Sequence, residues 1–238
     1  MEGQRRDLLW QIIAESIEAP AAEGWADAVC VACVSVLPGV DAAALTVRAD
    51  AVQETWGASD EWAGELEQLQ YTVGEGPGAE AFATGGPVLA PDLAADSDRW
   101  PGFAQASLPI GVAAMFAFPL QLGAIRLGTL DLYRGRPGRL SSRELTDAAV
   151  LANLATVAVL EQARQDRATG DSELSDPSGS YQEVSIATGM VAVQLRIGLD
   201  EALVRLRSRA FAEGRSVLEI AREVLGRKIR FDDPDGEA

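Results

Sequence analysis

A polar segment, residues 168–180, divides the chain into two parts and limits how it can fold. It reads Ala-Thr-Gly-Asp-Ser-Glu-Leu-Ser-Asp-Pro-Ser-Gly-Ser, a run of turn-forming residues with almost nothing to bury. At 238 residues the chain is long enough for two domains that each bury a core. We therefore predict an N-terminal domain over residues 1–167, a linker over 168–180, a small domain over 181–231 and an acidic tail over 232–238.

The two parts differ in charge. The whole chain carries 20 basic and 36 acidic residues, and its net charge of −16 normally argues against a nucleic-acid partner. Residues 1–180 contribute −15 of this charge and the last seven residues contribute −4, whereas residues 181–231 carry +3. Only the small C-terminal region is therefore basic.

The chain contains no histidine, the residue most often used as a general base and as a metal ligand. Nucleophile systems that need a histidine cannot be built, so we expect a protein that is not an enzyme, with no catalytic residues, no metal site and no cofactor. Cys30 and Cys33 lie inside an apolar run and are expected to pack in a core rather than to act as a redox pair. Without a secretory segment or a membrane span in the sequence, we expect a cytoplasmic protein.

Hydrophobic periodicity predicts mixed secondary structure in the first 167 residues. Helices are expected over residues 7–18, 25–37, 60–69 and 78–84, and a long helix is expected from the capping box of Ser141 and Glu144 to about residue 167. Extended segments are expected over residues 42–48, 52–57, 113–121 and 125–134, with Pro119 at an edge or a bulge. Strands between helices predict an α+β domain whose helices pack on one face of an antiparallel sheet.

The glycine-rich run Gly74-Glu75-Gly76-Pro77-Gly78-Ala79 fits the dinucleotide-binding pattern G-x-G-x-x-A. We place it after an extended run and before a helix, where a plain strand-to-helix turn is favoured over cofactor binding. The run from residue 71 to 77, the hairpin over 116–133 and the long closing helix together resemble a GAF domain over about residues 8–160.

The resemblance implies a five-stranded or six-stranded antiparallel sheet flanked by helices, with a pocket that senses a small molecule, or a role in dimerisation. Aromatic and sulfur side chains of this region are candidates for lining the pocket of an unidentified ligand, although a plain core is the alternative use for most of them. These candidates are Trp56, Tyr71, Trp100, Phe103, Met115 and Phe116.

Three short helices are expected in the basic region, over residues 181–195, 199–213 and 217–228. The last begins with the capping box of Ser216 and Glu219. On the second helix, Arg205 and Arg209 share one flank of the apolar stripe and Arg207 lies on the other. These arginines can contact an external ligand, or they can form ion pairs with acidic neighbours of the same helix.

The region also resembles the ANTAR domain, a three-helix RNA-binding module of bacterial transcription antiterminators. The matching residues are Ile186-Ala187-Thr188-Gly189-Met190-Val191, Asp200-Glu201-Ala202-Leu203-Val204-Arg205-Leu206-Arg207, Ala210, Arg215, Val217 and Ile220-Ala221. With the upstream part, the chain resembles the GAF-ANTAR regulators of the actinobacterial kind. The resemblance implies a transcription antitermination regulator that binds paired stem-loops in nascent RNA, through residues among Thr188, Gly189, Arg205, Arg207, Arg209 and Arg215.

We also expect a homodimer, because the long helix is apolar and the three-helix region is too small to bury much surface alone. A second interpretation is a ligand-sensing or protein-interaction module that does not bind RNA. The acidic larger part is expected to repel RNA until a rearrangement exposes the basic helices.

Overall fold

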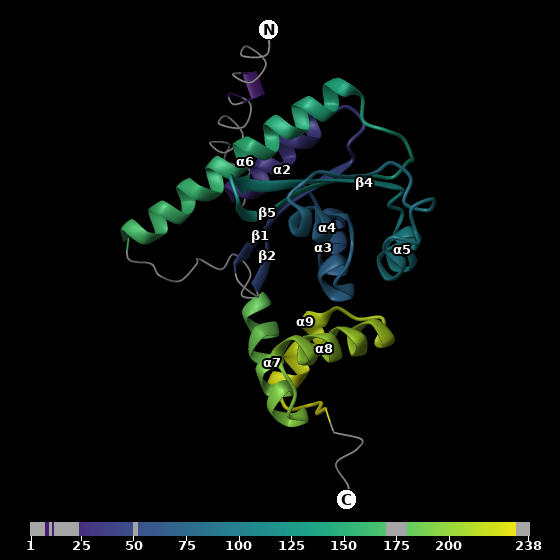
Figure 1. Ribbon diagram of the computed structural model, residues 1–238, viewed down its shortest axis with the longest axis vertical. Coiled ribbons are helices and arrows are strands. Elements are labelled where there is room, and N and C mark those ends of the chain that lie inside the picture. Colours follow the sequence, from purple (N-terminus) through teal and green to yellow (C-terminus); the bar gives the residue numbers. More distant parts are fainter. Residues whose placement is uncertain (1–7, 10, 12–23, 50–51, 170–179, 232–238) are drawn as a thin grey trace, which may run out of the picture.

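The computed structural model describes residues 8, 9, 11, 24–49, 52–169 and 180–231. Figure 1 shows a sheet with helices on both sides and, below it, a smaller group of three helices. We call residues 24–169 the sheet domain and residues 180–231 the helical module. The predicted helix over residues 7–18 and the predicted linker over 168–180 lie almost wholly outside the described residues.

The sheet has five antiparallel strands in the order β2-β1-β5-β4-β3. They are β1 (Ala42–Ala49), β2 (Val52–Ala58), β3 (Val88–Ala90), β4 (Ala114–Leu122) and β5 (Ile125–Arg134). Four of them confirm the predicted extended segments, and β3 was not predicted. Pro119 pairs with Thr129 of β5, beyond the part of β4 that pairs with β3, so its missing N–H group interrupts no ladder on that side.

One face of the sheet is covered by α2 (Trp25–Val36) and α6 (Ser142–Thr169). The core on this face is built around Leu45, Phe116 and Leu132. Cys30 and Cys33 of α2 are both free and fully buried there, and burial raises the pKa of the Cys33 thiol to about 12, which confirms core packing. The capping box at the start of α6 is present, with the Ser141 N–H donating to Glu144 and the Glu144 N–H donating to the Ser141 hydroxyl.

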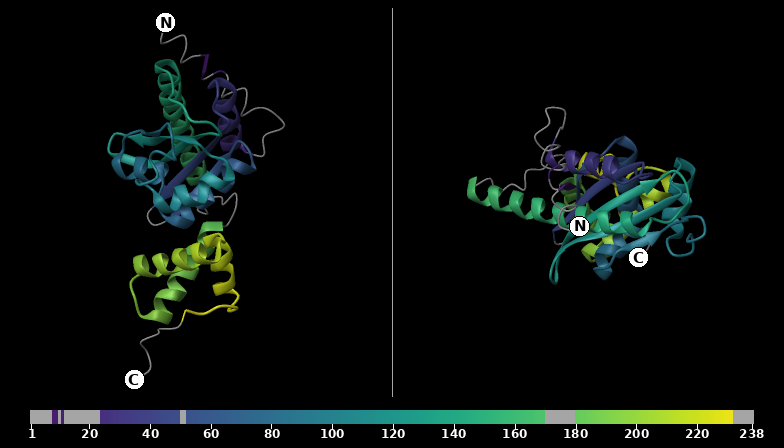
Figure 2. Two further views of the ribbon diagram at one scale, coloured as in Figure 1. Left: turned by 90° about the vertical axis from the view of Figure 1, so that its right-hand side faces the viewer. Right: turned by 90° about the horizontal axis from the view of Figure 1, so that it is seen from above.

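The opposite face is covered by α3 (Glu61–Val73), α4 (Pro77–Thr84), α5 (Pro101–Ser107) and the short helix η1 (Leu108–Ile110). The prediction that the helices pack on one face is therefore wrong. The physical reason is visible in β4, where successive apolar residues such as Met115 and Phe116 belong to opposite cores, so both faces of the sheet need a cover. The left view in Figure 2 shows the same layering.

The glycine-rich run connects two helices rather than a strand and a helix. Helix α3 continues through Tyr71 and Thr72 to Val73, beyond the predicted end at residue 69. It ends at Gly74, whose φ of 77° is the left-handed conformation that glycine adopts readily. The expected extended run before the glycines is wrong, and the strand that a dinucleotide-binding turn requires is missing at this point.

The helical module consists of α7 (Ser180–Leu195), α8 (Leu199–Glu213) and α9 (Val217–Leu225), as predicted. The capping box of Ser216 and Glu219 opens α9. The apolar core of the module includes Tyr71 of α3, so the two units share buried surface. In addition, the Val217 N–H donates to the Thr72 hydroxyl at 3.1 Å. Among the described residues, no helix has the length and apolar character needed to cross a bilayer.

Candidate functional site

A cluster of buried polar side chains lies between α3 and the sheet. Each of its side chains is at most 3% exposed, so all of them need partners inside the protein. The cluster comprises Thr46 of β1, Glu67 and Gln70 of α3, and Thr129, Asp131 and Tyr133 of β5. We call this set the polar cluster. Local geometry assembles it, because alternate residues of a strand face one side and residues three apart share a helix face.

Glu67 is the main acceptor of the polar cluster. Its carboxylate oxygens accept hydrogen bonds from the Thr46 hydroxyl at 2.8 Å, from the Gln70 amide at 3.1 Å and from the Tyr133 hydroxyl. Burial, followed by the nearby carboxyl of Glu67, raises the pKa of Tyr133, so this hydroxyl keeps its proton and can donate it. Three converging donors are the arrangement that stabilises a buried carboxylate.

Asp131 is the second carboxyl group in the same volume. Its Oδ2 accepts from the Gln70 amide at 3.2 Å and from the Thr129 hydroxyl at 3.4 Å, whereas its buried Oδ1 has no partner within the described part of the chain. Burial, and then the charge of Glu67, raises the pKa of Asp131 well above its ordinary value. Asp131 therefore holds its proton under conditions in which an exposed aspartate is ionised.

The start of α4 closes the polar cluster. The Gly78 N–H donates to Oε1 of Gln70 at 3.0 Å, and a Cβ atom at this position would collide with Oδ2 of Asp131. The last glycine of the glycine-rich run therefore allows the backbone to approach two buried polar side chains. This packing role replaces the cofactor-binding interpretation of the motif.

The Asp131→Asn variant is expected to gain stability relative to the wild type as pH rises. Below about pH 4 the wild-type carboxyl is protonated in both the folded and the unfolded chain, so the two proteins differ little. Above that pH the unfolded wild type releases the proton that the folded state keeps, and the relative free energy of unfolding changes by up to about 1.4 kcal/mol per pH unit. Urea denaturation of both proteins between about pH 4 and pH 8 measures this; a difference that does not vary with pH contradicts the raised pKa of Asp131.

The structure does not bring together the six side chains proposed to line a ligand pocket. Trp56 and Phe116 contact the core beside α2 and α6, and Tyr71 belongs to the core of the helical module. Trp100, Phe103 and Met115 are buried in the core beside α3. The proposed grouping fails because side chains adjacent in a strand point to opposite faces, and because α3 turns Tyr71 away from the sheet.

Sequence reasoning missed the polar cluster. The available signal was the position of Thr129, Asp131 and Tyr133, which alternate with leucines in a predicted strand. A carboxyl group on the same strand face as a tyrosine, in a strand whose other face carries leucines, indicates a buried polar site. The partner residues Glu67 and Gln70 could not be assigned without knowing which helix covers that face.

The arginines proposed to contact RNA are mostly engaged within the module. Arg205 pairs with Glu201 at 3.6 Å, and Arg209 pairs with Glu213 at 2.8 Å, which are the ion pairs expected as the alternative. Arg215 pairs with Glu223 at 3.0 Å and with Glu213 at 3.2 Å. On α7, Thr188 is buried and its hydroxyl donates to the Val184 carbonyl at 2.7 Å, while Gly189 is half-buried.

Arg207 has a different environment from its neighbours on α8. Its guanidinium carbon lies 5.1 Å from the centre of the Tyr71 ring, so the side chain faces the sheet domain. The flank predicted for Arg207, opposite to that of Arg205 and Arg209, is consistent with this contact. In this arrangement the sheet domain covers one of the proposed RNA-binding arginines.

Four other cations are exposed and have no ion pair with any described residue. They are Arg196, which follows α7, and Arg227, Lys228 and Arg230, which follow α9. We call them the terminal cations. Two of them line a hollow of about 410 Å³, whose lining residues are Met190, Gln194, Val224, Arg227, Ile229 and Arg230. Figure 1 shows that the end of α7 and the yellow segment that follows α9 lie on the side of the module away from the sheet domain.

Comparison with known proteins adds to these observations. A model of the GAF domain family matches residues 22–160, which is more than half of the chain. No curated protein matches the chain. Among solved structures, the GAF domain of a phosphoenolpyruvate-protein phosphotransferase from Acinetobacter is similar, at 12% identity and a TM-score of 0.53, over 71% of this chain and 98% of that chain.

Two further solved structures have lower TM-scores. The GAF domain of the phosphoenolpyruvate-protein phosphotransferase from Coxiella burnetii matches at 16% identity and a TM-score of 0.49, over 71% of this chain and 98% of that chain. A type II free methionine-R-sulfoxide reductase from Thermoplasma acidophilum matches at 13% identity and a TM-score of 0.44, over 66% and 96%. At such identities, the similarity to the Acinetobacter domain shows the fold alone.

Proposed function

The chain belongs to the GAF domain family, and from this premise we propose that it is a non-enzymatic regulator with two working parts. The sheet domain responds to a signal or pairs two protomers, and the helical module binds structured RNA as a transcription antiterminator does. The resemblance of the module to the ANTAR domain supports the second role. The polar cluster, a buried set of titratable groups, is the part of the sheet domain most sensitive to its surroundings.

The main structural support for the proposed RNA binding is that the terminal cations are exposed and form no ion pair with a described residue. RNA affinity arises largely from cations that neutralise phosphates, and a cation already paired with a carboxylate contributes less. Arg205, Arg209 and Arg215 are paired in this way, whereas the terminal cations are exposed and unpaired among the described residues. They also lie away from the sheet domain, whose negative charge repels a nucleic acid.

Helix α3 connects the two parts. Glu67 and Gln70 on its inner face belong to the polar cluster, while Tyr71 and Thr72 contact the helical module. Figures 1 and 2 show this helix between the sheet and the module. A signal that changes the hydrogen bonding of the polar cluster can therefore shift the element on which the module rests. This supports regulated exposure of the covered Arg207.

We expect the full chain to bind an RNA with two adjacent hairpins, and its affinity to fall as salt increases. Four phosphate contacts by the terminal cations give a slope of about −3 when the logarithm of the association constant is plotted against that of the salt concentration. Gel shifts or fluorescence anisotropy between about 50 and 400 mM salt measure the slope. The control is an RNA of equal length that forms no hairpin. Absence of binding at the lowest salt contradicts RNA binding.

The second candidate function is docking of a partner protein by the helical module, without RNA. It is favoured by apolar side chains on the outside of the module, because Val193 is 79% exposed and Leu199 is 63% exposed. The RNA titration separates the two functions, since the docking function predicts no salt-dependent binding of hairpin RNA.

We also propose that two copies of the chain pair as a homodimer through α6. This helix is 28 residues long and extends beyond the sheet in Figure 1, and Val157 on its outer side is 52% exposed. A second copy would cover this face and bring two helical modules into one particle, so that each module can bind one hairpin of a pair.

A further inference from the structure

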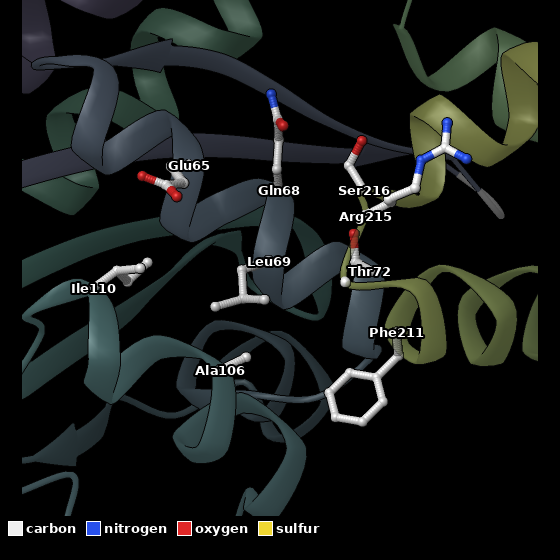
Figure 3. Close-up of a pocket in the computed structure, with 10 residues that line it drawn as sticks. Glu65, Gln68, Leu69, Thr72, Ala106, Ile110, Phe211, Arg215 and Ser216 are labelled. Atoms are coloured by element: carbon white, nitrogen blue, oxygen red, sulfur yellow. The ribbon is translucent and has the colours of Figure 1, made fainter.

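The contact between the two parts of the chain contains two hollows, one on each side of Phe211. The first has a volume of about 340 Å³ and reaches Leu69 of α3 and Ile110 of η1, and the second, of about 370 Å³, reaches Gly74. Both are lined by Thr72 of α3 and by Phe211 of α8. Figure 3 shows the Phe211 ring extending from the helical module toward the sheet domain. We call the two hollows together the interdomain cleft.

Arg207 lines the second hollow, and within the described residues the Tyr71 ring is the group that its charge contacts. Its Nε is buried without a hydrogen bond, and it forms no ion pair with any residue in the described ranges. Burial lowers the pKa of Arg207, which means that the charged guanidinium is less favourable at this site than in water. A half-buried guanidinium without a counter-charge is costly unless something supplies an anion.

The nearest acidic side chain in the hollow does not supply that counter-charge. Glu75 lines the same hollow, but its Oε1 accepts hydrogen bonds from the Gly102 N–H at 2.6 Å and from the Phe103 N–H at 3.1 Å. It is thus held at the beginning of α5, where backbone N–H groups bind a carboxylate. Arg48 adds a second positive charge close enough to act on Arg207, although the carboxyl groups of Asp131 and Glu67 also act on it, and its Nε is buried without a hydrogen bond to any described residue.

The remaining wall of the hollow is mostly apolar, and the hydroxyls of its two polar residues, Thr72 and Ser208, are engaged with backbone groups. Val73 and Val204 face it together with Phe211, which is 43% exposed in spite of lying at a domain contact. Cavities of a few hundred Å³ with apolar walls and one or two polar groups are typical of small-molecule sites. Inorganic phosphate alone would leave these walls uncovered, whereas a molecule with a ring or chain beside its anionic group would cover them.

We propose that the interdomain cleft binds a small organic anion, with the anionic group on Arg207 and the apolar part against Phe211. The proposal rests on and extends the proposed function, because it names the chemical class of the signal. The contacts that form the site do not involve RNA. Because the ligand touches α3 and α8 together, it stabilises the arrangement in which the module rests on the sheet domain.

Phenyl phosphate is a suitable probe, because it combines a ring with a dianion. Titration of the full chain by calorimetry or by NMR, without RNA, is expected to show saturable binding of one molecule per chain in the millimolar range or tighter. Inorganic phosphate has the anionic group without the ring, and phenol has the ring without the anionic group. Each is expected to bind at least about tenfold more weakly than phenyl phosphate.

The variants Arg207→Gln and Phe211→Ala are each expected to weaken phenyl phosphate binding at least about tenfold, and Arg207→Lys is expected to retain part of the affinity. Arg205→Gln is the matched control, since this arginine lies on the same helix outside the cleft, and it is expected to stay within about twofold of the wild type. Circular dichroism verifies that each variant is folded. Absence of binding, equal binding by the Arg207→Gln variant, or equal affinity for inorganic phosphate would overturn the proposal. These titrations use no RNA, so a failure of the full chain to bind RNA would not change how their results are interpreted.

Discussion

Changing Arg227 and Arg230 together to alanine is expected to reduce the RNA affinity of the full chain about 50-fold at roughly 0.1 M salt. Both side chains are exposed and line the hollow at the end of the helical module, and no ion pair with a described residue competes for them. The slope of the salt dependence is expected to become less steep by about 1.5, because two phosphate contacts are lost. Fluorescence anisotropy with a labelled two-hairpin RNA measures both quantities.

The matched control is the pair Arg205→Ala and Arg209→Ala, which removes the same charge from two arginines that form ion pairs. Because these arginines are paired with Glu201 and Glu213, we expect the control to lose less than about fivefold in affinity. The opposite ranking would show that RNA contacts the flank of α8 proposed from the sequence, and that the ion pairs break on binding.

Replacement of Glu67 by alanine is expected to lower the free energy of unfolding by about 4 kcal/mol. The substitution removes the common acceptor of Thr46, Gln70 and Tyr133 and leaves these buried donors without their partner. It also leaves a small cavity between α3 and the sheet. Urea denaturation followed by tryptophan fluorescence measures the loss.

Glu65→Ala is the control for this change, because Glu65 is exposed on the same helix and its replacement is expected to shift stability by no more than about 0.5 kcal/mol.

Removing the charge of each of the two carboxyl groups of the polar cluster is expected to change the free energy of unfolding in opposite directions. Neutralising Asp131 stabilises the fold near neutral pH, whereas removing Glu67 destabilises it, because only Glu67 has a full set of donors. A loss below about 1 kcal/mol for Glu67→Ala would show that the donors find water or other acceptors.

Local signals in the sequence were sufficient for most elements. The capping boxes at Ser141 and Ser216 set the starts of α6 and α9, and Gly214 marks the end of α8. The hairpin of β4 and β5 followed from two apolar runs separated by a turn. These features depend on neighbours within a few residues, and the sequence displays such neighbours directly.

The candidate sites were predicted less well. The pocket residues were chosen by type, but the structure distributes them over three cores. Arg227 and Arg230, which form no ion pair with a described residue, lie just beyond the end of α9, and the sequence alone does not distinguish them from the arginines that form ion pairs.

The order of apolar, charged and turn-forming residues by itself determined that this chain has an acidic α+β part and a basic three-helix part, and where the helices of both begin and end. Such features result from interactions between residues within one or two helical turns of each other. Only the tertiary structure decided that both faces of the sheet are covered, that Glu67 and Asp131 meet between a helix and two strands, and that Arg207 rests against Tyr71 rather than in solvent. These contacts join residues far apart in the sequence, and their partners are selected by the packing of whole elements, which no local pattern encodes.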